Sequence, residues 1–281
     1  MELGPNRYDI VSDGVLWLDG GAMCGVVPRP LWSKVIAPDE MNRIPLATNC
    51  LLARGPAGTI LVETGVGRDF DEKQHKIFNF DFNRSLLEGL SDQGVAPEDV
   101  DMVIQTHLHF DHCGNLAQKS AEGNYAPTFP RAEVVIQRGD WESALDPDLR
   151  TKPSYYPREF YKSIEKEGLL RLVDGETELA PGVRVLPRSG HTVSHQIVQF
   201  GSGDNRLVYL GDFIPMHYHL RMPYIMAFDL FPLTTLEHKL EFLPQAASQR
   251  TRVVFEHDVT IGFATLLEKD GQVVAEPIAG E

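Results

Sequence analysis

The chain has 281 residues, of which 42% are hydrophobic and 23% are charged, the composition of an ordinary globular protein with a substantial core. Its 26 Lys and Arg against 40 Asp and Glu give a net charge of −14, which argues against duplex nucleic acid and anionic membrane surfaces as partners. The sequence has three scattered cysteines, no recognisable signal peptide and no apolar run of membrane-spanning length. We therefore expect a cytoplasmic protein.

The first half of the chain alternates apolar, β-branched runs with turns. These runs predict strands at 7–11, 15–18, 49–53, 59–63, 100–105 and 133–137. Ser12-Asp13-Gly14 would join the first two strands as a hairpin. Residues 20–33 fit neither a helical nor a strand period, and we expect a packed surface loop or a lid over an apolar pocket. Asn83 is expected to cap a helix that runs to about Gln93.

The second half continues the same alternation. It predicts strands at 170–173, 183–186, 196–200, 207–210, 253–256 and 263–268. A short helix is expected after Gly139, a loop over 146–158 and a longer helix over 234–249, where leucines follow helical spacing. Asp270-Gly271 predicts a final turn. Many strands with few helices predict an α/β fold built on sheets.

The segment 106–112, with the sequence THLHFDH, carries four metal-competent side chains within six residues. His107 and His109 are two apart, so a strand end directs both imidazoles the same way. Asp111 and His112 follow where the chain can turn back. Such a strand end can hold two cations side by side, and two cations can hydrolyse an ester, a lactone, an amide or a phosphoester.

Three further candidate ligands each follow a predicted strand: His191, Asp212 and His257. Loops at one edge of a layered sheet can converge on a common centre. Imidazole and carboxylate ligands suit zinc, and they also suit iron, manganese or cobalt.

Together these motifs resemble those of the metallo-β-lactamase-fold hydrolases, in the family's order and over about half of the chain. The resemblance implies a four-layer αββα sandwich with two divalent metal ions, zinc being favoured, at the sheet edge. It implies that the first metal is bound by His107, His109 and His191, the second by Asp111, His112 and His257, and both by a bridging Asp212. Because these residues run from 107 to 257, we expect residues 1–281 to form a single domain.

One position departs from the family pattern. The turn Val62-Glu63-Thr64-Gly65 has Glu63 where the family usually has Asp. In the family that residue supports the ligands and does not bind metal, so the resemblance implies altered support and unchanged ligation.

Several members of the family fit the sequence less well. Asp212, where zinc β-lactamases have Cys, argues against antibiotic hydrolysis, the acidic charge argues against RNA processing, and His109 argues against a flavodiiron protein. The alternatives that remain open are a glyoxalase II-like thioesterase, an aryl or phosphate ester hydrolase, a mononuclear persulfide dioxygenase and a non-catalytic metal-binding protein.

Residues 211–235 are similar to a loop of the bacterial N-acyl homoserine lactonases, and Asp19-Gly20-Gly21-Ala22-Met23 also resembles that branch. We therefore predict a hydrolase of small-molecule lactones or esters. Its apolar cleft would suit an acyl chain or an aromatic group. The residues that we assign to substrate binding are Met23, Val26, Trp32, Phe213, His219, Met222 and Phe228, with Tyr224, Ile225 and Met226 as further apolar wall.

The predicted mechanism is hydrolysis by a hydroxide shared between the two metals. Asp111 would hold the second metal and relay a proton, and Tyr218 or Tyr224 would hydrogen-bond the substrate carbonyl. Exposed apolar loops near the cleft would suit a homodimer.

Overall fold

The computed structural model describes residues 1–278, in which two seven-stranded sheets form the centre of the protein. In spatial order the first sheet contains β1 (Glu2–Leu3), β2 (Asn6–Asp19), β3 (Arg43–Gly55), β4 (Gly58–Val62), β5 (Met102–Ile104), β8 (Glu133–Gln137) and β9 (Leu170–Val173). The second contains β10 (Thr177–Ala180), β11 (Val183–Pro187), β12 (Gln196–Phe200), β13 (Leu207–Tyr209), β14 (Arg252–Val254), β15 (Phe263–Lys269) and β16 (Gln272–Pro277). The short strands β6 (Ala117–Lys119) and β7 (Tyr125–Pro127) pair separately.

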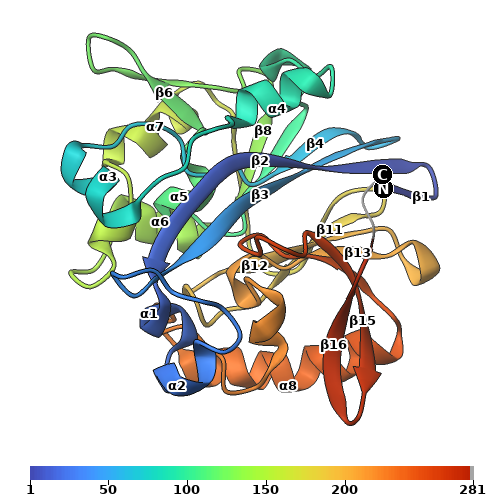
Figure 1. The fold of residues 1–281 in the computed structure, drawn as a ribbon. Helices are drawn as coiled ribbons and strands as arrows, with labels where there is room; N and C mark the ends of the chain where they lie inside the picture. Colours follow the sequence, from blue (N-terminus) through green and yellow to red (C-terminus); the bar gives the residue numbers. More distant parts are fainter. Residues whose placement is uncertain (279–281) are drawn as a thin grey trace.

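Helices cover the outer faces of the two sheets (Figure 1). The first sheet carries α4 (Leu86–Asp92), α6 (Arg138–Leu145) and α7 (Arg158–Lys166), which share one buried apolar cluster with β8. The second sheet carries α8 (Pro232–Ser248). Shorter helices lie in the connections: α1 (Gly20–Cys24), α2 (Arg29–Trp32), α3 (Glu72–Phe78) and α5 (Phe110–Cys113). The predicted αββα sandwich is therefore confirmed.

The side chains of each strand point alternately to the two faces of its sheet, and this alternation produces the layers. In β13, Leu207 and Tyr209 point into the core between the two sheets, whereas Val208 packs under α8. Successive side chains of a strand point to opposite faces, so a strand between a sheet and a helix must be apolar on both. No helix within residues 1–278 is long and apolar enough to cross a membrane.

The predicted hairpin at Ser12-Asp13-Gly14 is wrong, because β2 runs unbroken through it with a register irregularity between Ser12 and Val15. Asp13 is fully buried, and its carboxylate accepts 2.8 Å hydrogen bonds from the backbone N–H groups of Gly67 and Leu86. These tertiary donors let a turn-like sequence stay within a strand.

Other differences are local. Residues 20–33 contain α1 and α2, although no period was visible there. The cap of α4 is Ser85 rather than Asn83, since the Ser85 side chain accepts from the Glu88 N–H in a capping box. After the predicted turn at Asp270-Gly271 the chain adds β16, which the sequence did not predict.

The candidate ligands meet because their strands end at the same edge. β13 and β14 are parallel neighbours, so the loops that follow them place Asp212 and His257 side by side. β5 leads from the other sheet into the 106–112 segment. Only the packing of the two sheets brings these loops together.

Candidate metal centre

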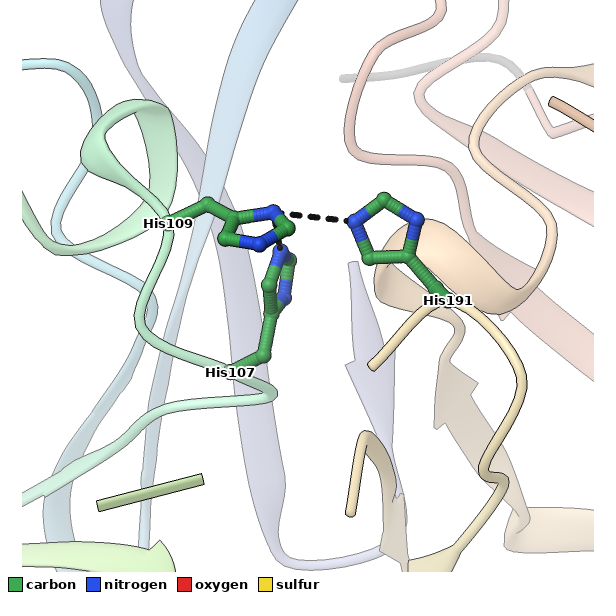
Figure 2. A group of neighbouring side chains, drawn as sticks. All are labelled: His107, His109 and His191. Carbon is green, nitrogen blue, oxygen red and sulfur yellow. Dashed lines mark hydrogen bonds between the residues drawn. The ribbon is translucent and has the colours of Figure 1, made fainter. Parts of the chain in front are cut away.

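Three imidazoles from two distant segments converge on one point (Figure 2). The Nδ1 atom of His109 lies 3.1 Å from Nε2 of His107 and 3.0 Å from Nε2 of His191. All three side chains are at least nine-tenths buried. Ligand atoms around a tetrahedral zinc ion lie roughly 3.3–3.6 Å apart, so this group has dimensions close to those of a metal site.

A second group lies beside the first. Its Nε2 atoms, from His112 and His257, are 3.4 Å apart. The Asp111 carboxylate lies 3.7 Å from the first and 3.8 Å from the second. These side chains are also buried, and their spacing again fits ligands around one cation.

Asp212 lies between the two groups. Its Oδ2 is 3.1 Å from Nε2 of His191, and its Oδ1 is 3.1 Å from Nε2 of His257. Oδ2 also lies 3.6 Å from Nε2 of His112. The structure thus brings together all seven residues that the sequence assigned as ligands, with Asp212 facing both sets.

The hydrogen bonds on the outer side of the imidazoles fit a metal site. Nδ1 of His191 bonds to Asp229, and Nδ1 of His257 bonds to the Ala47 carbonyl at 2.7 Å, so each ring turns its Nε2 inward. Oδ1 of Asp212 is buried and lies 3.1 Å from Nε2 of His257. Ring nitrogens and a carboxylate that converge in a dry interior are stabilised together by a bound metal ion.

Neighbouring charges and burial shift the pKa values of the candidate ligands. Burial alone would raise the pKa of Asp212, but the imidazoles of His191, His112 and His257 hold it well below its usual range. Burial and the neighbouring His112 lower the pKa of His107, which favours the neutral imidazole that a metal requires. Burial would also lower the pKa of His257, but Asp212 outweighs it and raises that pKa to about 9.

Two supporting carboxylates were not predicted from the sequence. Asp229 Oδ1 lies 3.0 Å from Nδ1 of His191, and Glu256 Oε1 lies 2.9 Å from Nδ1 of His112. Glu256 could have been noticed because it precedes His257 at a strand end, whereas no local pattern marks Asp229. Glu63, which stands where the family usually has Asp, accepts a 2.6 Å hydrogen bond from the Thr106 N–H. It therefore holds the backbone of the segment 106–112.

A cavity of about 820 Å³ opens onto both groups, and its lining includes His109, Asp111, His191, Asp212 and His257. Of the predicted substrate residues, Met23 and Phe228 line it, as does the further wall residue Met226. Most of its other apolar wall was not predicted and comes from Trp17, Leu18, Met41, Leu46, Ile77, Phe78 and Phe110. Such a volume with mainly apolar walls suits a small organic ligand.

The other predicted pocket residues lie outside this lining, which corrects the expected wall. Phe213 and Met222 pack in the core under α8. Trp32 is buried in a core beside α1, and the exposed Val26 borders a separate hollow. His219 is buried and hydrogen-bonds the Met23 carbonyl.

The two tyrosines expected at the substrate carbonyl also lie outside the cavity lining. Tyr218 is buried, and its hydroxyl contacts the Met216 sulfur. Tyr224 packs in the same apolar core and borders the hollow next to Val26. The position of these tyrosines in the chain could not predict which way their side chains point. In the structure, residues 211–235 turn both side chains into the apolar core.

The chain belongs to the Metallo-beta-lactamase superfamily, which it matches over residues 43–257. An N-acyl homoserine lactonase from Bacillus sp is 30% identical over 179 residues, which cover 58% of this chain and only 61% of that protein. A 27% identical match to the N-acyl homoserine lactonase of Bacillus cereus covers 66% of this chain and 70% of that protein. These relatives support placing the chain in the superfamily branch that includes the lactonases.

Solved structures share the fold of this chain. A probable metal-dependent hydrolase from Staphylococcus aureus has a TM-score of 0.89 at 27% identity, with both chains fully covered. AidC, described as a dizinc quorum-quenching lactonase in complex with a product, has a TM-score of 0.80 at 20% identity, covering 100% of this chain and 97% of its own. At that identity the second comparison shows a shared fold.

Proposed function

We propose that this chain is a dinuclear metal-dependent hydrolase that opens lactones or cleaves esters, with N-acyl homoserine lactones as the favoured substrate class. The observation that carries the proposal is the Asp212 carboxylate, which faces two groups of candidate ligand atoms in the lining of a mainly apolar cavity. The lactonase relatives support the substrate class. Because the ligand residues come from loops of both sheets, we propose that residues 1–281 act as one catalytic unit.

His107, His109 and His191 would hold one ion, Asp111, His112 and His257 the other, and Asp212 both. Two zinc ions are favoured, with iron, manganese or cobalt as alternatives. When bound, such a pair supplies hydroxide at neutral pH and polarises a carbonyl.

The protein side chains supply orientation and proton transfer. Asp229 and the Ala47 carbonyl fix the rings of His191 and His257 through their Nδ1 atoms. Asp111 borders the cavity, so its carboxylate can carry a proton from the attacking water to the leaving alkoxide. We assign no role to Tyr218 or Tyr224 because neither lines the cavity.

The apolar walls supply binding and exclude water. Phe78, Phe110 and Met226 are suited to an acyl chain, whose burial strengthens binding roughly in proportion to the apolar area removed from water. A drier cavity also strengthens the electrostatic interactions around the candidate ligands.

The test combines metal analysis with a substrate panel. We would measure metal content by mass spectrometry and follow hydrolysis with a pH indicator, using acyl homoserine lactones, aryl esters, a phosphotriester and a glutathione thioester. We expect two metal ions per chain and metal-dependent turnover that is fastest on a lactone. Turnover of the thioester alone would favour a glyoxalase II-like enzyme, and no metal-dependent turnover at all would refute the hydrolase proposal. A stoichiometry near one would refute the dinuclear centre.

A further inference from the structure

Residues 71–80, which we call the flap, form one wall of the cavity without being buried in the protein. The flap contains α3, none of whose residues is buried. Lys76, Ile77 and Phe78 nevertheless border the cavity. Phe78 reaches Phe110, next to the ligand Asp111, with ring centroids 5.1 Å apart.

The flap is anchored on either side. Before it, Asp69 accepts hydrogen bonds from Lys119 Nζ and the Tyr125 hydroxyl, each at 3.1 Å. After it, Asp81 and Val15 exchange two backbone hydrogen bonds of 2.8 and 3.0 Å. Fixed ends with an exposed middle describe a segment that can open locally while the rest of the fold stays intact.

Between these anchors one side chain makes the polar connections. Within residues 1–278, every hydrogen bond between the flap and another part of the chain comes from the Arg43 guanidinium. Its Nη1 donates to the carbonyls of Lys76 and Ile77 at 2.9 and 3.0 Å. These carbonyls belong to the last turn of α3, where they lack helical partners and where a positive charge is favourable.

Arg43 is itself held in place. Its Nε and Nη2 each lie 2.8 Å from Asp39 Oδ2, and its own backbone N–H donates to Asp39 Oδ1 at 2.8 Å. The side chain is 17% exposed and borders the cavity. A planar guanidinium can serve Asp39 and two carbonyls at once, which an ammonium group on a lysine cannot do with the same geometry.

We propose that Arg43 is a latch that holds the flap closed over the cavity and thereby determines specificity for long acyl chains. The choice of substrate rests on the proposed function, whereas the latch itself does not. With the latch closed, Ile77 and Phe78 stay in place as apolar wall that a bound acyl chain can contact. With the latch released, a bound chain loses this wall, and the loss grows with the apolar area that the chain would bury against it.

The test compares Arg43→Gln and Arg43→Lys with Arg54→Gln. Arg54 is a matched control on the same strand, because it pairs with Asp9 at 2.7 Å and donates to the Gln93 carbonyl after α4 at 3.0 Å, away from the cavity. Hydrogen exchange by mass spectrometry is measured on each metal-loaded protein, together with its free energy of unfolding. If Arg43→Gln does not fold, Arg43→Lys carries the test.

We expect flap amides to exchange about tenfold faster or more in the Arg43 variants, with no matching change elsewhere or in Arg54→Gln. The ratio of kcat/KM for a long-chain over a short-chain acyl lactone should fall about tenfold, mainly through KM. Unchanged flap exchange, or faster exchange throughout the protein, would overturn the latch. An unchanged chain-length ratio despite faster flap exchange would overturn the role in specificity. If no lactone is hydrolysed, the proposed function fails, while the exchange result still decides whether Arg43 is a latch.

Discussion

Nδ1 of His191 lies 3.0 Å from Oδ1 of Asp229, which is 38 residues further along the chain. The other Asp229 oxygen accepts a 2.6 Å hydrogen bond from the Thr235 hydroxyl, and both partners are buried. The carboxylate therefore sets the tautomer and the orientation of the imidazole, with its Nε2 directed at His109 and Asp212.

Replacing Asp229 with Asn should weaken metal binding by about 10- to 100-fold, because the neutral amide no longer raises the basicity of His191. Competition with a chelator measures the affinity. Asp174→Asn is the control, since Asp174 forms an exposed pair with Arg138 and should leave the affinity unchanged. Equal affinities of the Asp229 variant and the parent protein would show that the contact does not tune the site.

His109→Ala should lower turnover by about a thousandfold, because it removes the imidazole whose Nδ1 lies closest to both His107 and His191. The fold should persist, as the apolar clusters on both sides of the site are untouched. We would measure the metal content, the steady-state rate and, as a check on folding, the near-ultraviolet circular dichroism of the variant. A folded variant with the parent's rate would remove His109 from the ligand set.

Metal affinity should rise with pH between about 6 and 9. In the metal-free protein the pKa of His257 is raised to about 9, so its proton stays bound at neutral pH and a metal has to displace it. The pKa of Asp212 is lowered, so this carboxylate is already ionised and adds nothing to the change. Titration calorimetry at pH 7 in two buffers of different ionisation enthalpy should show about one proton or more released per chain. Heats independent of the buffer would contradict this.

Lys239→Met should lower the free energy of unfolding by about 2–4 kcal/mol. The Lys239 side chain is almost completely buried, and its Nζ donates to the backbone carbonyls of Arg221 and Tyr224 at 2.8 and 2.9 Å. Methionine fills the space but leaves these carbonyls without a donor. Urea denaturation measures the loss.

The control for this variant is Lys162→Met on α7, where the Lys162 side chain is 39% exposed. Its effect should stay within about 0.5 kcal/mol. A similar small effect at Lys239 would mean that water or a backbone shift satisfies the carbonyls.

Local sequence patterns predicted much of the fold. The strands predicted at 133–137, 170–173 and 196–200 agree with β8, β9 and β12, because a short run of apolar residues between turn signals has few alternatives. The hairpin predicted at Ser12-Asp13-Gly14 is wrong because that prediction used only neighbouring residues. The hydrogen-bond donors that stabilise Asp13 within β2 come from residues 67 and 86.

For the candidate site, too, one part could be predicted from local sequence and another could not. His107, His109, Asp111 and His112 are close in sequence, so their spacing alone indicated a metal site. The cavity wall could not be predicted equally well, because an apolar residue in a loop can face the substrate or the core. Met23 lines the cavity, whereas the nearby Trp32 is buried in the core beside it.

The sequence by itself predicted the candidate ligands and the layered fold, since the first depend on residue chemistry and the second on periods of two and 3.6 residues. Only the tertiary structure decided which carboxylates support the ligands, which side chains line the cavity, and that Arg43 reaches α3. Those relationships join residues that are far apart in the chain, and the distance between such residues is set by the packing of the two sheets and not by local conformation.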